Sequence, residues 1–272
     1  MQALSQLSYG PVVAGRLLRT GELSPAALRG YRLSSADQVH EGVLGVDSCM
    51  AVDRRGLADP YARRARAEGF AARSAYKLLE MQRRWSLLRR GDAALDLGCA
   101  PGAWLQAAAR FVMPGGALVG LDLQPMDRNV LPAGAVALQG DVFVVSPAWL
   151  CAQLQRLRGG GDSRFDVVLS DMAPATSDSP QSDHHASIRL GERALEVASE
   201  TLTPRGVCVV KFFEGEASTE FVRRARERFA RVRLFKPKAS RARSREMYLL
   251  GETPTGGFSA AGASAGATEG DV

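Results

Sequence analysis

The chain has 272 residues, of which 46% are apolar, so it can bury one sizeable core. No apolar run approaches the ~20 residues that a membrane-spanning helix needs, which excludes a helical membrane protein, and we expect a soluble monomer. The net charge is +6, and the four cysteines are scattered without a Cys-x-x-Cys pair or nearby histidines, so we expect neither a metal site nor a disulfide framework.

Residues 1–57 form an extension in which short apolar stretches are broken by glycines and prolines. Up to residue 33 it contains four arginines and one acidic residue, Glu22, which fits an organellar transit peptide or an arginine-rich bacterial start. Alanine, arginine and glycine are abundant along the whole chain, which favours the bacterial interpretation. We therefore expect a cytoplasmic bacterial protein with a partly disordered extension; a mitochondrial or plastid protein with a targeting segment is the alternative.

Between residues 58 and 252, short apolar strands alternate with amphipathic helices. This alternation predicts an α/β domain whose parallel sheet is covered by helices on both faces, and ligands of such sheets bind at the carboxyl ends of the strands. Residues 253–272 are rich in glycine, alanine, serine and threonine and predict a disordered tail. The predicted helices cover 73–88, 103–112, 147–157, 184–202 and 217–229, and the predicted strands cover 93–97, 117–122, 135–139, 165–170, 206–213, 231–236 and 246–251.

A glycine turn follows the first predicted strand, with Asp-Leu-Gly-Cys-Ala-Pro-Gly-Ala-Trp over residues 96–104. Glycine at Gly98 and Gly102 allows close approach of a ligand, and Asp122 at the end of the second strand can accept both hydroxyls of a ribose. The glycine spacing differs from the Gly-x-Gly-x-x-Gly fingerprint that holds a pyrophosphate, which disfavours a nicotinamide-dependent oxidoreductase. The pattern favours a nucleoside without phosphates, of which S-adenosylmethionine is the common example.

Four charged residues of the predicted domain lie in or beside its helices and strands at positions that bear on function. Asp171 directly follows an apolar strand and therefore lies at the carboxyl edge of the sheet. Lys211 interrupts the apolar run 206–213, where an ammonium is costly unless carboxylates pair with it. Lys77, in an amphipathic helix, is equally compatible with a surface lysine, and Glu246 begins the last strand. Lys211 is thus the residue that a purely structural explanation accounts for least.

Basic residues are concentrated in two segments. Residues 54–90 contain eleven Arg or Lys against three acidic residues, and residues 223–245 contain eleven against one. Two such segments in an otherwise acidic chain predict a polyanionic partner, RNA or DNA, bound through salt-sensitive phosphate contacts. Two solvated helix faces are the structural alternative.

Short motifs that bear these residues follow one another in order over residues 59–251. They are Asp59-Pro-Tyr, Arg73-Ser-Ala-Tyr-Lys-Leu-Leu-Glu80, Asp96-Leu-Gly-Cys-Ala-Pro-Gly-Ala-Trp104, Asp122-Leu-Gln-Pro-Met-Asp127, Gly140-Asp141, Ser170-Asp-Met-Ala-Pro174, Val210-Lys211 and Lys236-Pro-Lys-Ala-Ser-Arg-Ala-Arg-Ser-Arg-Glu246. Together they resemble the FtsJ/RrmJ-type (RlmE family) ribosomal RNA 2′-O-methyltransferases. The resemblance implies a class I, Rossmann-like methyltransferase fold with a seven-stranded, mainly parallel sheet whose last strand is antiparallel.

The resemblance also implies the site residues. The catalytic residues would be Lys77, Asp171, Lys211 and Glu246, and the residues that bind S-adenosylmethionine would be Gly102, Trp104, Asp122, Asp141 and Asp171. Asp122 would bind the cofactor ribose, Asp141 the adenine amino group, and Trp104 would form part of the pocket wall. Lys211 would orient a ribose 2′-hydroxyl or accept its proton.

The implied reaction is methylation of a ribose 2′-hydroxyl in large-subunit ribosomal RNA, at a uridine, in support of ribosome assembly. The implied partner is ribosomal RNA within the large ribosomal subunit. Two alternatives stay open from the sequence. One is a tRNA 2′-O-methyltransferase, because Asp122-Leu-Gln-Pro-Met also occurs in the tRNA branch of the family. The other is a non-catalytic RNA-binding factor for ribosome assembly, although all four implied catalytic residues are present.

Overall fold

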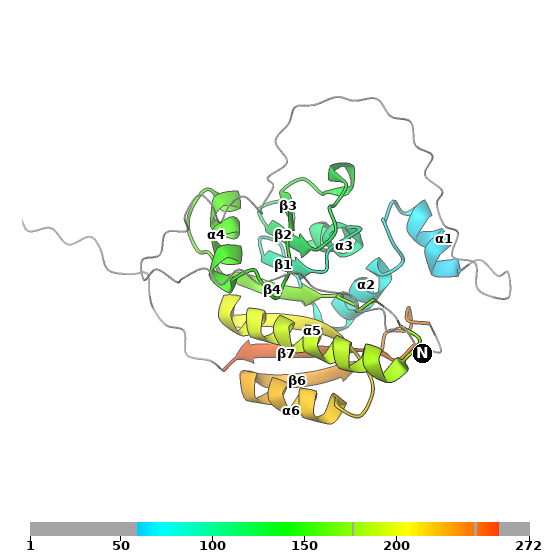
Figure 1. Ribbon diagram of the computed structural model, residues 1–272. Helices are drawn as coiled ribbons and strands as arrows, with labels where there is room; N and C mark the ends of the chain where they lie inside the picture. Colours follow the sequence, from blue (N-terminus) through cyan, green and yellow to red (C-terminus); the bar gives the residue numbers. More distant parts are fainter. Residues whose placement is uncertain (1–58, 176, 242–243, 256–272) are drawn as a thin grey trace, which may run out of the picture. The chain divides into compact units, whose positions relative to one another are not determined.

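The computed structural model describes residues 59–175, 177–241 and 244–255 of the chain. These residues form six α-helices, a 3₁₀ turn and seven strands (Figure 1). The predicted extension over residues 1–57 and the predicted tail beyond residue 255 lie outside the described residues. The helices are α1 Pro60–Ala67, α2 Ala75–Trp85, α3 Ala103–Val112, α4 Pro147–Arg158, α5 Pro180–Thr201 and α6 Ser218–Arg228. The strands are β1 Ala93–Leu97, β2 Ala117–Asp122, β3 Ala135–Gln139, β4 Phe165–Ser170, β5 Leu202–Phe213, β6 Phe229–Phe235 and β7 Glu246–Pro254.

All seven strands belong to one sheet, in the order β3-β2-β1-β4-β5-β7-β6. Strands β1 to β5 pair in parallel, whereas β7 is antiparallel to both of its neighbours, β5 and β6. The carboxyl ends of β1 to β5 therefore meet at one edge of the sheet. The prediction of a seven-stranded, mainly parallel sheet with an antiparallel last strand is confirmed.

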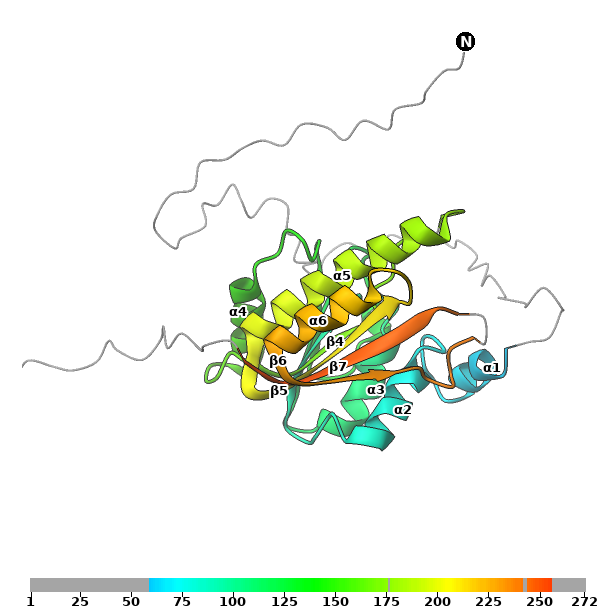
Figure 2. The ribbon, with the colours of Figure 1, turned by 90° about the horizontal axis from the view of Figure 1, so that it is seen from below.

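Helices cover the two faces of this sheet. Helices α4, α5 and α6 pack on one face, and α3, with α2 against it, packs on the other (Figure 2). With both faces covered, the central strands are mostly apolar, and all five residues of β1 are buried, Asp96 included. The largest buried side chains come from the strands and from helices on both faces, such as Leu78 of α2 and Phe221 of α6, so both faces of the sheet contribute to the buried interior.

Four predicted strands, β1 to β4, have the observed bounds, whereas one helix was missed and several other boundaries differ from the prediction. Helix α1 was not predicted, although the Asp59 carboxylate accepts the Tyr61 N–H at 3.0 Å and Pro60 occupies the first turn. Helix α5 begins at Pro180 rather than residue 184, because the Ser179 hydroxyl caps its first turn. Strand β5 begins four residues early, at Leu202, where it pairs with β4.

Strand β7 continues through Pro254, two residues past the predicted domain end, because Pro254 pairs with Phe229 of β6. Within the ranges that the structure describes, no helix combines the length and the apolar character needed to cross a membrane.

Candidate active site

A cavity of about 460 Å³ opens at the carboxyl edge of the sheet. It lies where β1, β2, β3 and β4 end, and three carboxylates line it, those of Asp122, Asp141 and Asp171. None of its described lining residues is basic, and the rest of the lining is mostly apolar or glycine. Three carboxylates without a basic neighbour in the lining suit an uncharged or cationic nucleoside and disfavour a phosphate, in agreement with the expectation from the glycine spacing.

The turn after β1 holds Asp122 in place. The Asp122 Oδ2 accepts the Ala100 N–H at 2.9 Å, and the Asp122 Oδ1 accepts the Gln124 N–H at 2.8 Å, so the carboxylate is fixed at the cavity wall. Glycine is required at Gly98, where φ is +80° and an added Cβ would lie 2.7 Å from the Met172 side chain. The turn therefore brings main chain, rather than a side chain, to the ligand cavity.

A second loop, after β3, presents Asp141. The Asp141 carboxylate accepts the Phe143 N–H at 2.9 Å. Helix α5 fixes this loop through Arg193, whose guanidinium donates to the Val142 carbonyl at 2.8 Å and to the Val145 carbonyl at 2.9 Å. The adenine-side residues implied by the sequence thus rest on a loop that is tied to a long helix.

The four implied catalytic residues converge beside the cavity. The Lys211 Nζ lies 3.0 Å from the Asp171 Oδ1 and donates to the Asp171 carbonyl at 2.5 Å. The Lys77 Nζ lies 3.0 Å from the Glu246 Oε1 and 3.8 Å from the Asp171 Oδ1. The lysine side chains are 5% and 9% exposed, so two cations and two carboxylates share a nearly buried network.

The sheet register explains this convergence. Lys211 near the end of β5 is opposite Tyr248 of the antiparallel β7, and Phe213 is opposite Glu246. The start of β7 therefore lies at the same edge as the end of β5, and α2 brings Lys77 to that edge from one face of the sheet. Residues separated by 169 positions, Lys77 and Glu246, become hydrogen-bonded neighbours.

A family model described as FtsJ-like methyltransferase matches residues 70–253 of the chain. The chain belongs to the FtsJ-like methyltransferases. The family predicted from the sequence motifs is confirmed, and with it the class of the reaction, methyl transfer.

This FtsJ-like methyltransferase has close relatives in bacteria and archaea. Proteins named ribosomal RNA large subunit methyltransferase E share 43% identity in Desulfatibacillum aliphaticivorans, over 73% of this chain and 92% of that protein, and 42% in Marinobacter nauticus, over 71% and 89%. The protein of that name in Methanosarcina barkeri shares 38% identity, over 75% of this chain and 72% of that protein. A crystal structure described as a ribosomal RNA methyltransferase from Plasmodium falciparum covers 69% of this chain and all of its own, with a TM-score of 0.58 and 23% identity, which supports the fold.

Tyr248 of this FtsJ-like methyltransferase was missed by the sequence analysis. Its hydroxyl donates to the Asp171 Oδ1 at 2.6 Å, and its side chain is buried. Burial, with Asp171 and Glu246 nearby, raises the pKa of the phenol well above its usual range, which keeps the hydroxyl a donor. The two-residue period of a strand places residues 246 and 248 on one face of β7, and this period was the available signal.

Two implied cofactor residues do not line the cavity. Trp104 is buried, its indole N–H donates to the Ser74 carbonyl at 2.9 Å, and its ring stacks on Tyr248 at 5.9 Å between centroids. Gly102 precedes α3 with φ at +108°, and an added Cβ would lie 3.0 Å from Val130. Their implied contacts with a cofactor stay predictions.

Asp96, one residue before the end of β1, carries a buried carboxyl to which the sequence analysis assigned no role. It is 1% exposed, and neither of its carboxylate oxygens has a hydrogen-bond partner among the described residues. Burial, reinforced by the charges of Asp171 and Asp122, raises the pKa of this carboxyl well above its usual range. Burial therefore disfavours the charged form of Asp96.

The basic segment predicted over residues 223–245 is not one basic surface. In α6, Arg223 pairs with Glu220 at 2.7 Å, and Arg224 pairs with Glu192 of α5 at 2.6 Å. These carboxylates lie outside the sequence window in which the charges were counted. The arginines of α6 are thus partly neutralised.

The loop after β6 has a different environment, because it packs against the start of α2. The Arg73 guanidinium donates to Asp59 and to the Ala239 carbonyl, and the Lys238 N–H donates to the Glu80 carboxylate at 2.9 Å. This part of the second basic segment therefore lies beside the first, next to the helix that carries Lys77.

Proposed function

We propose that this protein transfers a methyl group from S-adenosylmethionine to a ribose 2′-hydroxyl of large-subunit ribosomal RNA. The observation that carries the proposal is the network of Lys77, Asp171, Lys211 and Glu246 beside a carboxylate-lined cavity. The substrate is supported by relatives at 37–43% identity that are named ribosomal RNA large subunit methyltransferase E.

The cavity fits the proposed cofactor, which supplies a methyl group activated by a positively charged sulfur. Three carboxylates and no basic described side chain favour a cationic nucleoside over a dinucleotide. Asp122 lies at the end of β2, and each of its carboxylate oxygens accepts one backbone N–H. Each oxygen therefore keeps a lone pair that can accept a hydrogen bond from a ribose hydroxyl. Asp141, on the loop that Arg193 anchors, would accept a hydrogen bond from the amino group of the adenine.

Lys211 positions the substrate hydroxyl. An ammonium has three donors, and two of those on Lys211 are directed at Asp171, so one remains for the 2′-oxygen of a ribose. Asp171 and Glu246 hold the two lysines and balance their charges. Acceptance of the hydroxyl proton by Lys211 would first require the loss of a proton from its own ammonium. Alignment of the hydroxyl is therefore the first contribution of the network to the rate.

RNA phosphates are bound by the basic residues nearest the network. Helix α1 carries Arg63, Arg64 and Arg66, and Lys236 and Lys238 lie on the exposed loop that packs against α2. These groups position the strand without reading its sequence. The arginines that pair with glutamates contribute less, because their charges are already matched; they are Arg64 of α1, which pairs with Glu68, and Arg223 and Arg224 of α6.

We place this activity in the cytoplasm of a bacterium and assign it to a monomer, since one chain supplies all four residues of the network. Two of the relatives named above come from bacteria, Desulfatibacillum aliphaticivorans and Marinobacter nauticus. The segment that would carry an organellar signal lies outside the described residues.

The test is single-turnover transfer of a labelled methyl group from S-adenosylmethionine to undermodified large ribosomal subunits and, in parallel, to tRNA. Lys211→Ala should lower the rate of transfer to ribosomal RNA by at least ~10²-fold, as expected for the loss of a positioned acid–base group. Arg205→Ala is the matched control, because Arg205 lies in the same strand, β5, near its opposite end and carries the same charge.

Calorimetry with S-adenosylmethionine and circular dichroism establish that each variant is folded and binds the cofactor. Transfer to tRNA alone would replace the proposed substrate. A wild-type protein that binds S-adenosylmethionine and ribosomal subunits but transfers nothing would favour the non-catalytic assembly factor. A Lys211→Ala protein with the wild-type rate would show that the proposed site is wrong.

A further inference from the structure

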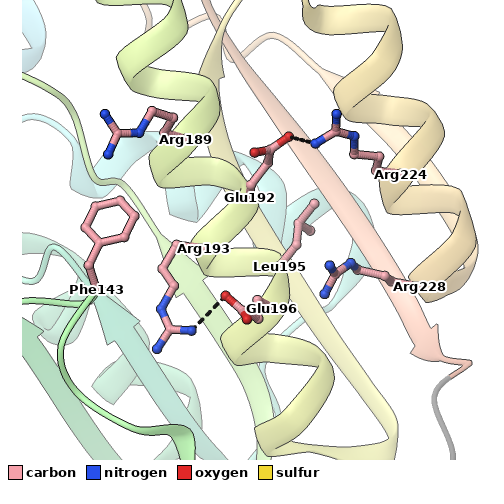
Figure 3. A pocket seen from close by; sticks show the side chains of 8 residues that line it. All are labelled: Phe143, Arg189, Glu192, Arg193, Leu195, Glu196, Arg224 and Arg228. Atoms are coloured by element: carbon pink, nitrogen blue, oxygen red, sulfur yellow. Dashed lines mark hydrogen bonds and ion pairs between the residues drawn. The ribbon is translucent and has the colours of Figure 1, made fainter.

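A second cavity, of about 330 Å³, lies between α5 and α6 and meets the cofactor cavity at Phe143, which lines both. Figure 3 shows its eight lining side chains, which come from α5, from α6 and from the loop after β3. None of the proposed catalytic residues lines it. It is therefore a separate surface that borders the adenine side of the proposed active site.

The side chains that line this groove carry more positive than negative charge. Four arginines and two glutamates line it, and each glutamate already has a partner. Glu192 pairs with Arg224 at 2.6 Å, and Glu196 pairs with Arg193 at 2.7 Å (Figure 3). Arg189 and Arg228 remain, and neither forms an ion pair with a carboxylate in the part of the chain that the structure describes. Both side chains are exposed. Two guanidinium groups thus face solvent with their donors available for an anion.

An aromatic ring lies beside one of these cations. Phe143 is 48% exposed, which is unusual for a large apolar side chain, and the Arg189 guanidinium lies 5.8 Å from the centre of its ring. Arg193 anchors the backbone that carries this ring, because it donates to the Val142 and Val145 carbonyls on either side of Phe143 in sequence. An anion held by Arg189 would therefore have an exposed aromatic ring on an anchored loop next to it.

We infer that the α5–α6 groove binds a short segment of single-stranded RNA, with two of its phosphates on Arg189 and Arg228 and a base stacked on Phe143. Arginine with an exposed aromatic side chain is the combination that recognises single strands without a fixed sequence. The inference rests on the proposed RNA substrate and adds a contact remote from the methylated ribose. A free nucleotide offers the same chemistry, so the test separates the two sources.

The experiment measures binding of a labelled single-stranded RNA oligonucleotide to the full-length protein by fluorescence anisotropy across a salt series. The double variant Arg189→Gln/Arg228→Gln should weaken binding and reduce the slope of log affinity against log salt by ~1.4, because each phosphate contact on a single strand contributes ~0.7. Phe143→Ala should weaken binding by about tenfold and leave the slope unchanged, because stacking does not displace counterions.

The matched control is Arg223→Gln, which removes a charge from α6 outside the groove and should leave the slope unchanged. Adenosine monophosphate and inorganic phosphate serve as the probes for a free nucleotide or anion. If either bound the groove while the RNA slope stayed at its wild-type value, the RNA assignment would be overturned.

Methyl transfer and S-adenosylmethionine binding, measured on the same proteins, separate this inference from the proposed function. A double variant that transfers methyl groups and keeps the wild-type RNA affinity and slope would refute the groove alone. A wild-type protein that binds S-adenosylmethionine but no RNA would refute both.

Discussion

Two clusters in this protein each pair two basic side chains with two carboxylates, and they differ in burial. The first is the network of Lys77, Asp171, Lys211 and Glu246, whose side chains are 5–20% exposed. The second lies on α5 and α6, where Glu220 and Glu192 pair with Arg223 and Arg224, and its side chains are 36–56% exposed. Each cluster contains ion pairs of 3.0 Å or less, so the shortest distances alone do not distinguish the two clusters.

The difference in burial gives the two clusters different energetic consequences. Exposed ion pairs contribute little to stability, because water screens them and long side chains lose entropy when they pair. Buried charges must recover a desolvation penalty of several kcal/mol each, and apolar residues of similar size would often serve stability as well or better. A nearly buried network of four charges is therefore best explained by its chemistry, and the exposed cluster by solvation.

The largest effect should follow from breaking the buried network. Lys211→Ala leaves Asp171 with one lysine, at 3.8 Å, and should lower the free energy of unfolding by about 3 kcal/mol. Urea denaturation followed by circular dichroism measures this change. An unchanged free energy of unfolding would mean that water replaces the ammonium and that the network is more open than its burial indicates.

A smaller effect should follow from removing one hydroxyl that supports the network. Tyr248→Phe deletes the 2.6 Å hydrogen bond to the Asp171 carboxylate and keeps the stacking on Trp104. We expect a loss of about 2 kcal/mol in the free energy of unfolding, the typical contribution of a hydrogen bond to a charged group. The rate of methyl transfer should also fall, with cofactor affinity nearly unchanged. A Tyr248→Phe protein with both wild-type stability and wild-type rate would contradict the role assigned to this hydroxyl.

The buried carboxyl of Asp96 should make the stability of the protein depend on pH. Because burial raises the pKa of Asp96 in the folded protein, the unfolded chain loses its proton first as the pH rises above about 4. The free energy of unfolding should then fall with pH by up to ~1.4 kcal/mol per pH unit, until the folded-state pKa is reached.

Asp96→Asn removes this titration, so the stability of the variant relative to the wild type should increase with pH. Urea denaturation of both proteins across a pH series measures the difference. Parallel curves would indicate that Asp96 has the same pKa in the folded and unfolded states.

The smallest effect should come from the exposed cluster. The Arg223 side chain is 56% exposed and pairs with two glutamates of α6, Glu220 and Glu227. Arg223→Gln removes both ion pairs. We expect no change in the free energy of unfolding beyond the experimental error, because screening leaves little to lose. A destabilisation comparable to that of Lys211→Ala would remove the distinction between the two clusters.

The strands were predictable because each carries a local signal. Strands β1 to β4 are short apolar runs bounded by turn residues, and all residues of β1 are buried on both faces as such runs indicate. The unpredicted helix α1 shows the limit of the same approach. It has a good capping residue, Asp59, but its sequence is mostly arginine and alanine and lacks an apolar stripe, with only Ala65 buried.

The site was predictable where a residue stands out in its own strand, as Lys211 does. Tyr248 does not stand out, because a tyrosine in a strand is ordinary, and its partner Asp171 is 77 residues away. The charge of α6 was misjudged for the same reason, since Glu192 lies on another helix. Partners that come from distant segments are fixed by the sheet order, and the spacing of residues along the chain does not contain that information.

The position of β7 has a consequence for the order of events during synthesis. This strand is inserted between β5 and β6, and it supplies Glu246 to Lys77 and Tyr248 to Asp171. On the ribosome, Lys77, Asp171 and Lys211 therefore emerge before the groups that balance and orient them. The nascent chain cannot complete its network of charges until the residues of β7 have left the exit tunnel, so translation itself delays the assembly of the site to the last strand of the sheet.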